Sequence, residues 1–159
     1  MNIWSAACST GEEPYTIAMI LSKYTSDFSV LATDIDEQAL GRAKKGFYTE
    51  SSITNVPRSL RERCFEKQNL GYIVKNEIRQ SVKFEKHNLL SDRYKGNFDF
   101  IACRNVLIYL VEEAKRRIYR NFHDSLTPGG VLFVGCTEQI FHPQQYGFEP
   151  LTTFFYTRP

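Results

Sequence analysis

The sequence lacks the patterns that build disulfides, metal centres and membrane spans. It has four cysteines but no C-x-x-C pair, and its three histidines, His87, His123 and His142, lack metal-ligand spacing. No apolar run is long enough to cross a bilayer, and no signal peptide precedes the first cysteine. We therefore expect a cytoplasmic protein with reduced cysteines, without a metal site and without membrane insertion.

A strong charge of either sign is also missing. The 159 residues carry a net charge of +2 with 42% hydrophobic residues, which is typical of one soluble domain long enough to bury a core. Basic residues gather in two expected helices that also carry acids, so a solvated helix face explains them better than a nucleic-acid surface. We expect no nucleic-acid partner.

Glycine is scarce in the segment where a dinucleotide-binding loop would need it. SAACSTGEEPY, residues 5–15, joins an apolar strand at 3–7 to a helix at 12–24 and contains one glycine. It therefore lacks the G-x-G-x-x-G pattern that lets the backbone approach a pyrophosphate. Glu12 and Glu13 would also repel phosphates. The predicted ligand is phosphate-free, and either cationic or rich in hydroxyls.

The sequence allows two interpretations of Glu12. Ser9 or Thr10 can cap the helix, with Glu12 or Glu13 three residues further on as in a capping box. That role would explain the acid without any ligand. Alternatively, the Glu12 carboxylate faces the ligand.

The rest of the chain alternates strands with helices, which predicts an α/β fold with a mostly parallel sheet covered on both faces. The further expected elements are strands at 29–34, 82–87, 98–103 and 131–136, helices at 37–45, 57–63 and 112–126, and an antiparallel close near 139–149 and 153–158. The pattern loosens from Gly46 to about Lys86, and within it a small antiparallel insertion is expected at about 64–86, with strands at 72–74 and 78–84. Ligands of such sheets bind at the carboxyl ends of the strands.

Two aspartates follow the second expected strand. Asp34 is placed to accept hydrogen bonds from the hydroxyls of a ribose. Asp36 directly precedes a helix, so we expect it to be the helix cap. The alternative for Asp34 is a plain strand-end residue.

Polar residues also follow two later strands. Asn88 and Leu89 offer an amide and an apolar wall to an adenine, although a turn asparagine followed by a core leucine fits equally well. Arg104 and Asn105 follow a buried strand, and a charge there needs water, a ligand carboxylate or an ion pair with a nearby acid. Tyr109 either faces the same site or simply packs.

Five segments in order along the chain carry a family resemblance: SAACSTGEEPY, ATDID at 32–36, HNLL at 87–90, FDFIACRNVLIY at 98–109 and LTPGGVLFVG at 126–135. Together they resemble the CheR family of chemotaxis receptor methyltransferases. The resemblance implies a Rossmann-like class I S-adenosylmethionine-dependent methyltransferase fold with a mostly parallel seven-stranded sheet and a small antiparallel β insertion. It also implies S-adenosylmethionine as cofactor and S-adenosylhomocysteine as product.

The resemblance implies methyl transfer to glutamate side chains of chemoreceptors. It places Glu12 at the ammonium of the methionine moiety, and Arg104 with Tyr109 as candidate catalytic residues. The expected cofactor-binding residues are Glu12, Asp34, Asn88, Leu89, Arg104 and Asn105. A carboxylate is already ionised at neutral pH, so the reaction needs no general base.

Partners and competing functions follow from the same comparison. The expected partner is the cytoplasmic domain of methyl-accepting chemoreceptors, whereas the short connection FEKQNLGYIV does not favour docking of a receptor's carboxyl-terminal peptide. CheR proteins begin with a helical domain and this sequence begins inside the first strand, so we expect a fragment or a shortened form that binds cofactor and methylates poorly. The alternative is a non-catalytic domain that binds S-adenosylmethionine, S-adenosylhomocysteine or a protein partner. A dehydrogenase is disfavoured by the missing glycines.

Overall fold

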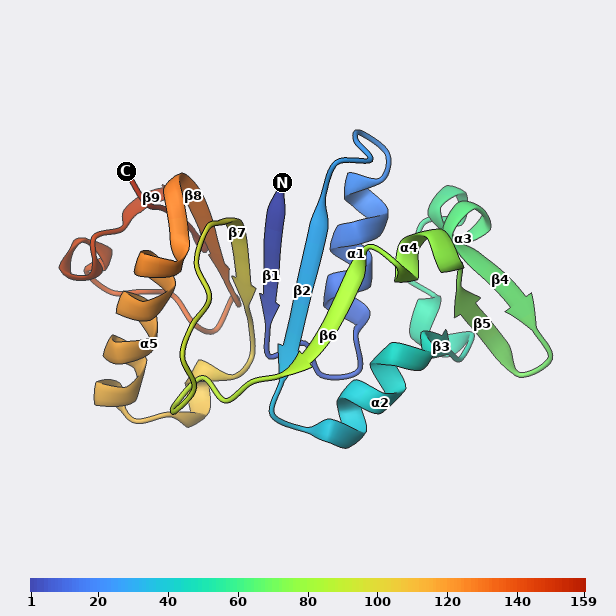
Figure 1. Ribbon diagram of the computed structural model, residues 1–159, viewed down its shortest axis with the longest axis horizontal. Helices are drawn as coiled ribbons and strands as arrows, with labels where there is room; N and C mark the ends of the chain where they lie inside the picture. Colours follow the sequence, from blue (N-terminus) through green and yellow to red (C-terminus); the bar gives the residue numbers. More distant parts are fainter.

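A seven-stranded sheet forms the centre of the computed structural model, which describes residues 1–159 (Figure 1). The strand order is β6-β2-β1-β7-β8-β10-β9; the first five are parallel, and β10 and β9 each pair antiparallel with the strand before them. The strands are β1 (Asn2–Ala6), β2 (Ser29–Asp34), β6 (Val82–Lys86), β7 (Phe98–Cys103), β8 (Leu126–Val134), β9 (Glu149–Thr152) and β10 (Phe155–Thr157). The predicted mostly parallel seven-stranded sheet is confirmed.

The antiparallel close differs in part from the expectation. Only Glu149–Thr152 and Phe155–Thr157 pair as strands, whereas most of 139–149 is irregular and contains the 3₁₀-helix η3 (Pro143–Tyr146). Pro143 has no backbone N–H to donate to a sheet, and Gly147 follows with a φ of 85°, so the chain turns here instead of extending.

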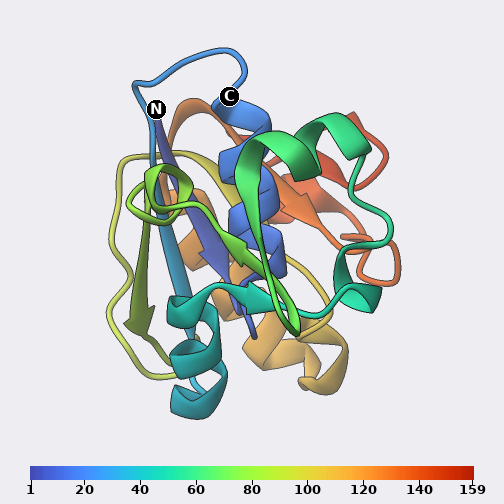
Figure 2. The same ribbon diagram turned by 90° about the vertical axis from the view of Figure 1, so that its right-hand side faces the viewer.

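Helices cover both faces of the sheet. One face packs against α1 (Glu12–Leu21), α2 (Glu37–Lys45) and α3 (Arg58–Cys64), and the other against α5 (Glu112–Ser125) (Figures 1 and 2). Side chains alternate between the faces, so that Ile3 belongs to the first core and its neighbour Trp4 to the second. None of the helices is both long and apolar enough to span a membrane.

A small antiparallel sheet lies beside α1, but its strands are not all those expected. It has the order β3-β5-β4, formed by β3 (Phe47–Tyr48), β4 (Phe65–Gln68) and β5 (Gly71–Val74). The strand expected at 78–84 is wrong: α4 (Asn76–Arg79) occupies its start, and β6 takes its end into the main sheet. Val82 and Phe84 pack into the first core, which explains why an apolar alternation there belongs to the large sheet.

The start of α1 corrects the capping-box interpretation. The cap is Gly11, with a φ of 94° and no side-chain cap hydrogen bond. A Cβ at Gly11 would lie 2.9 Å from the Cβ of Ala43, so glycine is required both by conformation and by close packing. Glu12 is therefore left without a capping role. Asp36, by contrast, caps α2 as predicted and accepts two backbone N–H groups of the first turn.

The carboxyl ends of three neighbouring strands meet at one edge of the sheet. Ala6 of β1 pairs with Thr33 of β2 on one side and with Cys103 of β7 on the other. The chain leaves β1 toward β2 and later returns to β7 on the opposite side of β1, so strand order reverses at this point. Crevices at such switch points are the usual ligand sites of open α/β sheets.

Candidate active site

A cavity of about 710 Å³ opens at this edge of the sheet. Its polar lining comes from three strand ends and includes Glu12, Glu13, Asp34, Arg104 and Asn105. Its apolar lining comes from α1 and from the face of β7, β8 and β10 that α5 does not cover, and includes Ile17, Ile20, Phe100, Phe133 and Phe155. Four of the predicted site residues therefore face one cavity.

The loop after β1 is held in an unusual conformation by Asp34. Ala7 and Ser9 have positive φ angles of 65° and 50°, which side-chain-bearing residues rarely adopt. The Asp34 carboxylate accepts a hydrogen bond from the Ser9 N–H at 2.8 Å and another from the Asp36 N–H at 2.9 Å. Because each oxygen holds one donor, each keeps an acceptor position for a ligand.

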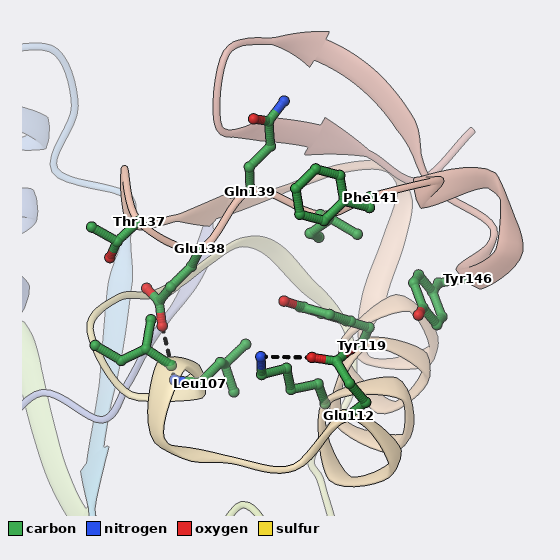
Figure 3. Close-up of a pocket in the computed structure, with 11 residues that line it drawn as sticks. Leu107, Glu112, Tyr119, Thr137, Glu138, Gln139, Phe141 and Tyr146 are labelled. Atoms are coloured by element: carbon green, nitrogen blue, oxygen red, sulfur yellow. Dashed lines mark hydrogen bonds and ion pairs between the residues drawn. The ribbon is translucent and has the colours of Figure 1, made fainter.

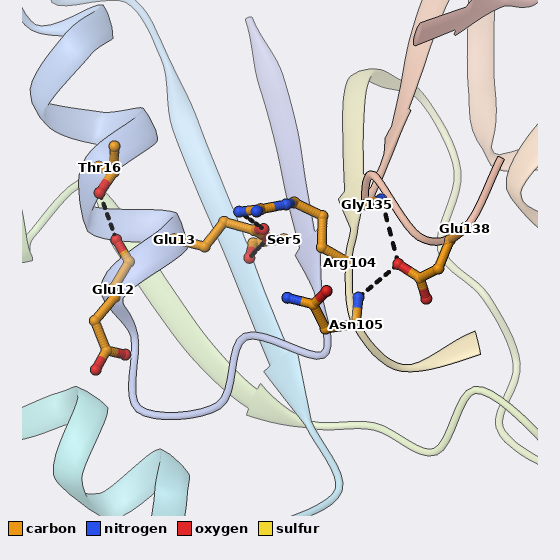
Figure 4. A network of polar contacts seen from close by, with 8 residues as sticks. All are labelled: Ser5, Glu12, Glu13, Thr16, Arg104, Asn105, Gly135 and Glu138. Atoms are coloured by element: carbon orange, nitrogen blue, oxygen red, sulfur yellow. Dashed lines mark hydrogen bonds and ion pairs between the residues drawn. The ribbon is translucent and has the colours of Figure 1, made fainter. Parts of the chain in front are cut away.

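The two glutamates at the start of α1 have different surroundings (Figure 4). Glu12 is exposed, and its carboxylate accepts only the Thr10 hydroxyl, at 2.7 and 2.8 Å. Glu13 accepts the Ser5 hydroxyl at 2.7 Å and lies 3.7 Å from Arg104. Burial raises the pKa of Glu13 above its ordinary value of 4.5, against the lowering effects of Ser5 and Arg104.

Arg104 forms the ion pair that its sequence position allowed, and it also contacts an aromatic ring. Its guanidinium pairs with Glu13 and lies over the Phe133 ring at 5.5 Å from the centroid. The side chain nevertheless stays 41% exposed and lines the cavity. The structural ion pair is therefore present, and it leaves the guanidinium able to donate further hydrogen bonds to a ligand.

Asn105 has a left-handed backbone, with a φ of 60°, and its N–H donates to Glu138 at 2.6 Å. Glu138 is one of two residues that sequence reasoning missed, the other being Glu13 as the partner of Arg104. Glu138 is only 5% exposed. A lone acid after an apolar strand is a weak signal, and three of its four main-chain partners lie more than 30 residues away.

Three predicted residues do not line the cavity. Asn88 follows β6 beside β2, but its side-chain oxygen accepts the Leu90 N–H at 2.9 Å, as in the turn interpretation. Leu89 packs against the second core. Tyr109 lies in the 3₁₀-helix η2 (Leu107–Tyr109), with its side chain 81% exposed.

The cysteines near the cavity are not activated nucleophiles. Burial, reinforced by the charge of Asp34, raises the pKa of Cys8 to about 12, and burial likewise raises the pKa of Cys103 well above its usual value. Both thiols therefore stay protonated at neutral pH. No three side chains of the metal-ligating types come together as a metal-binding cluster.

Two solved structures are similar to this fold. A TehB-like S-adenosylmethionine-dependent methyltransferase from Corynebacterium glutamicum matches with a TM-score of 0.57 and 18% identity, over 98% of this chain and 77% of its own. PKMT2 from Rickettsia typhi, in complex with S-adenosylhomocysteine, matches with a TM-score of 0.54 and 18% identity, over 84% of this chain and 20% of its own. The fold is that of class I S-adenosylmethionine-dependent methyltransferases.

Sequence relatives narrow this class to a family. Residues 1–155 match the S-adenosylmethionine-binding domain of CheR methyltransferases. The chain is 41% identical to a chemotaxis protein methyltransferase of Listeria monocytogenes, over 99% of this chain and 61% of the relative. It is 38% identical to the chemotaxis protein methyltransferase of Escherichia coli, over 89% of this chain and 53% of the relative. The chain belongs to the CheR methyltransferase family, and the cofactor of its domain is S-adenosylmethionine.

The match confirms the resemblance of the five sequence segments. The chain spans about three-fifths or less of the length of these curated relatives.

Proposed function

We propose that the cavity binds S-adenosylmethionine and that the chain is the cofactor-binding part of a methyltransferase that esterifies glutamate side chains of chemoreceptor cytoplasmic domains. One observation carries the proposal: Glu12, Asp34, Arg104 and Asn105 come from three strand ends and line a single cavity. Membership of the CheR family supplies the reaction class.

The charges of the cavity fit this cofactor. Three carboxylates and one guanidinium line it, which favours a cationic ligand such as a sulfonium and disfavours a phosphate. Asp34 has acceptor positions for two ribose hydroxyls, and Glu12 has no basic partner to compete with the ligand's ammonium. Arg104 is the one cation available to the ligand's carboxylate.

The proposal also assigns Asn88 and Leu89 to the adenine base of the cofactor. The backbone N–H of His87 donates to the Asp34 carbonyl at 3.0 Å, so the chain leaves β6 at the same edge as the ribose-binding position. Asn88 follows directly, and its amide N–H groups are able to donate to the base, since only its oxygen is used in the turn. Leu89 would then form an apolar side of the adenine pocket.

The chemistry needs positioning more than acid–base catalysis. S-adenosylmethionine supplies an electrophilic methyl group when bound, and a glutamate carboxylate is already the nucleophile at neutral pH. The protein's task is to hold the cofactor's amino-acid end through Glu12, Arg104 and Asn105, and to exclude water from the receptor carboxylate. Tyr109, four residues after Asn105, is exposed and therefore accessible to a protein substrate.

Two measurements test the proposal. Calorimetry should show S-adenosylhomocysteine binding to the chain, with NADH as the control ligand that should not bind. Transfer of a tritiated methyl group to receptor cytoplasmic fragments should then give a weak label that mild base releases as methanol, as a methyl ester does and a methylamine does not. Absence of binding at millimolar S-adenosylhomocysteine, or a base-stable label, would contradict the proposal.

A further inference from the structure

Glu138 is a buried acid whose carboxylate is surrounded by backbone donors. It lies in the turn after β8 and accepts hydrogen bonds from the N–H groups of Asn105 at 2.6 Å, Val106 at 3.0 Å, Leu107 at 2.8 Å and Gly135 at 3.2 Å (Figures 3 and 4). Three of these donors form the loop that follows β7. The carboxylate therefore connects two loops at the carboxyl edge of the sheet.

The turn that carries Glu138 contains a glycine, Gly135, which allows the Glu138 carboxylate to approach the backbone. A Cβ at Gly135 would lie 2.5 Å from a Glu138 carboxylate oxygen and 3.3 Å from the side-chain oxygen of Asn105. Glycine is therefore the one residue that leaves room for both groups. The same distances show that the Asn105 side chain lies against the turn that carries Glu138.

The surroundings of Glu138 exclude direct contact with a ligand in the large cavity. The acid is 5% exposed and does not line that cavity. It borders instead a separate space of about 150 Å³, lined also by Leu107, Tyr119 and Phe141 (Figure 3). Any effect of Glu138 on a bound cofactor must therefore pass through the residues that it holds.

We propose that Glu138 is a positioning residue, which holds Asn105 in its left-handed conformation and so directs the side chain of Asn105 to the cofactor. The inference rests on the proposed binding of S-adenosylmethionine in the cavity. A positive φ is costly for a residue with a side chain and persists where the surroundings impose it. Four hydrogen bonds to one carboxylate supply that restraint at Asn105.

The restraint requires a carboxylate and not simply a polar group of similar size. All four partners are donors, and an ionised carboxylate accepts without donating. A glutamine has one oxygen and one NH₂ group, so it would direct donor atoms at backbone N–H groups and leave some of them unsatisfied. Buried N–H groups without acceptors are destabilising, so the loop is expected to rearrange.

The central experiment combines Glu138→Gln with Asn105→Gly, which removes the side chain and tolerates the positive φ. In calorimetry with S-adenosylhomocysteine, E138Q alone should weaken binding at least tenfold. In the Asn105→Gly background the same substitution should weaken it less than threefold, because the residue being positioned is gone. Such non-additivity is the signature of residues that act through each other.

The matched control is Tyr156→Phe. Its hydroxyl accepts the Ile140 N–H at 3.0 Å, two residues from Glu138, so its loss loosens the same turn without removing the carboxylate. Tyr156→Phe should leave the dissociation constant unchanged. If it weakens binding as much as E138Q does, general loss of order explains the effect and the proposal is wrong. Wild-type affinity in a folded E138Q protein would also overturn it.

A ligand-free measurement separates this inference from the proposed function. Charge-assisted hydrogen bonds shift amide protons downfield, so the amide signals of Asn105 and Leu107 should move upfield in E138Q and stay in place in Tyr156→Phe. This readout holds even if the wild-type chain binds no S-adenosylhomocysteine, an outcome that would contradict the proposed function alone. If E138Q does not fold, Glu138→Asp keeps the charge, and its amide shifts should lie nearer the wild-type values than those of Glu138→Ala; equal shifts in the two would refute the inference.

Discussion

The loops that follow β1 and β7 are held in the same way but by acids of different exposure. Asp34, at the end of β2, fixes the loop that contains Ser9, and Glu138, after β8, fixes the loop that contains Asn105. Asp34 ends the strand beside β1, Glu138 follows the strand beside β7, and each acid restrains a residue with a positive φ. Asp34 is partly buried and lines the cavity, whereas Glu138 is 5% exposed and does not.

This difference shows how one arrangement can serve two purposes. Asp34 holds one backbone N–H on each oxygen and keeps acceptor positions that face the cavity. Glu138 holds four backbone N–H groups and has no such surplus. An acid that restrains a loop can therefore bind a ligand only if the protein leaves some of its hydrogen-bond acceptor positions free.

The largest effect is expected at Gly135, which allows Glu138 to approach. Gly135→Ala should lower the free energy of unfolding by about 3 kcal/mol, because the new methyl group overlaps the carboxylate. Gly41→Ala in α2 is the matched control, since a Cβ there has no neighbour within 4 Å. It should raise stability by about 1 kcal/mol through helix propensity. Urea unfolding measures both, and equal effects would refute the steric argument.

The next effect concerns Asp34, the more exposed of the two acids. Asp34→Ala should weaken binding of S-adenosylhomocysteine by about 2 kcal/mol, since ribose hydroxyls would lose their acceptor and the loop at Ser9 its restraint. Calorimetry on the folded variant measures the change. An unchanged affinity would show that Asp34 has no part in binding the ligand.

Asp36 separates capping from binding. Asp36→Ala should lower stability by about 1 kcal/mol, because α2 loses its side-chain cap. Its affinity for S-adenosylhomocysteine should not change, since the backbone N–H that bonds to Asp34 is retained. A loss of affinity comparable to that of Asp34→Ala would show that the two aspartates act together on the ligand.

The smallest effect is expected at Glu13, and it concerns how the free energy of unfolding depends on pH. Burial raises the pKa of this carboxyl above 4.5, so the folded state binds its proton more tightly than the unfolded state does. Its contribution to stability is then greatest at low pH and is lost as the pH rises from the unfolded pKa through the folded one. Glu13→Gln should remove this component from unfolding curves measured across that range. An unaltered pH dependence would contradict the shift.

The sequence predicted the elements whose residues show strong periodicity. The strands β1, β2, β6 and β7 and the helices α1, α2 and α3 lie close to where apolar alternation or helical spacing placed them. The sequence also predicted that Glu12, Asp34, Arg104 and Asn105 lie together, because parallel strands end at one edge of the sheet; all four line one cavity. The roles of these residues toward a cofactor remain predictions.

Features that depend on long-range or backbone geometry were not predictable in this way. The capping box failed because Gly11, in a left-handed conformation packed against α2, caps α1 instead of Ser9 or Thr10. Glu138 was missed because its partners are main-chain amides, which any sequence provides. The expected strand at 78–84 was divided between α4 and β6, since alternation alone does not identify the sheet to which a strand belongs.

The central position of β1 has a consequence for the order of folding. β1 pairs with β2 after one short crossover, but with β7 only after nearly a hundred residues have been made, as the hydrogen bond from the Asn2 N–H to Asp99 illustrates. Loop closure over such a separation is slow, so we expect the β7 half to dock late. Glu12 and Asp34 belong to the early half, and Arg104 and Asn105 to the late one. A ligand that bridges the two would thus report completed folding and would stabilise that last step.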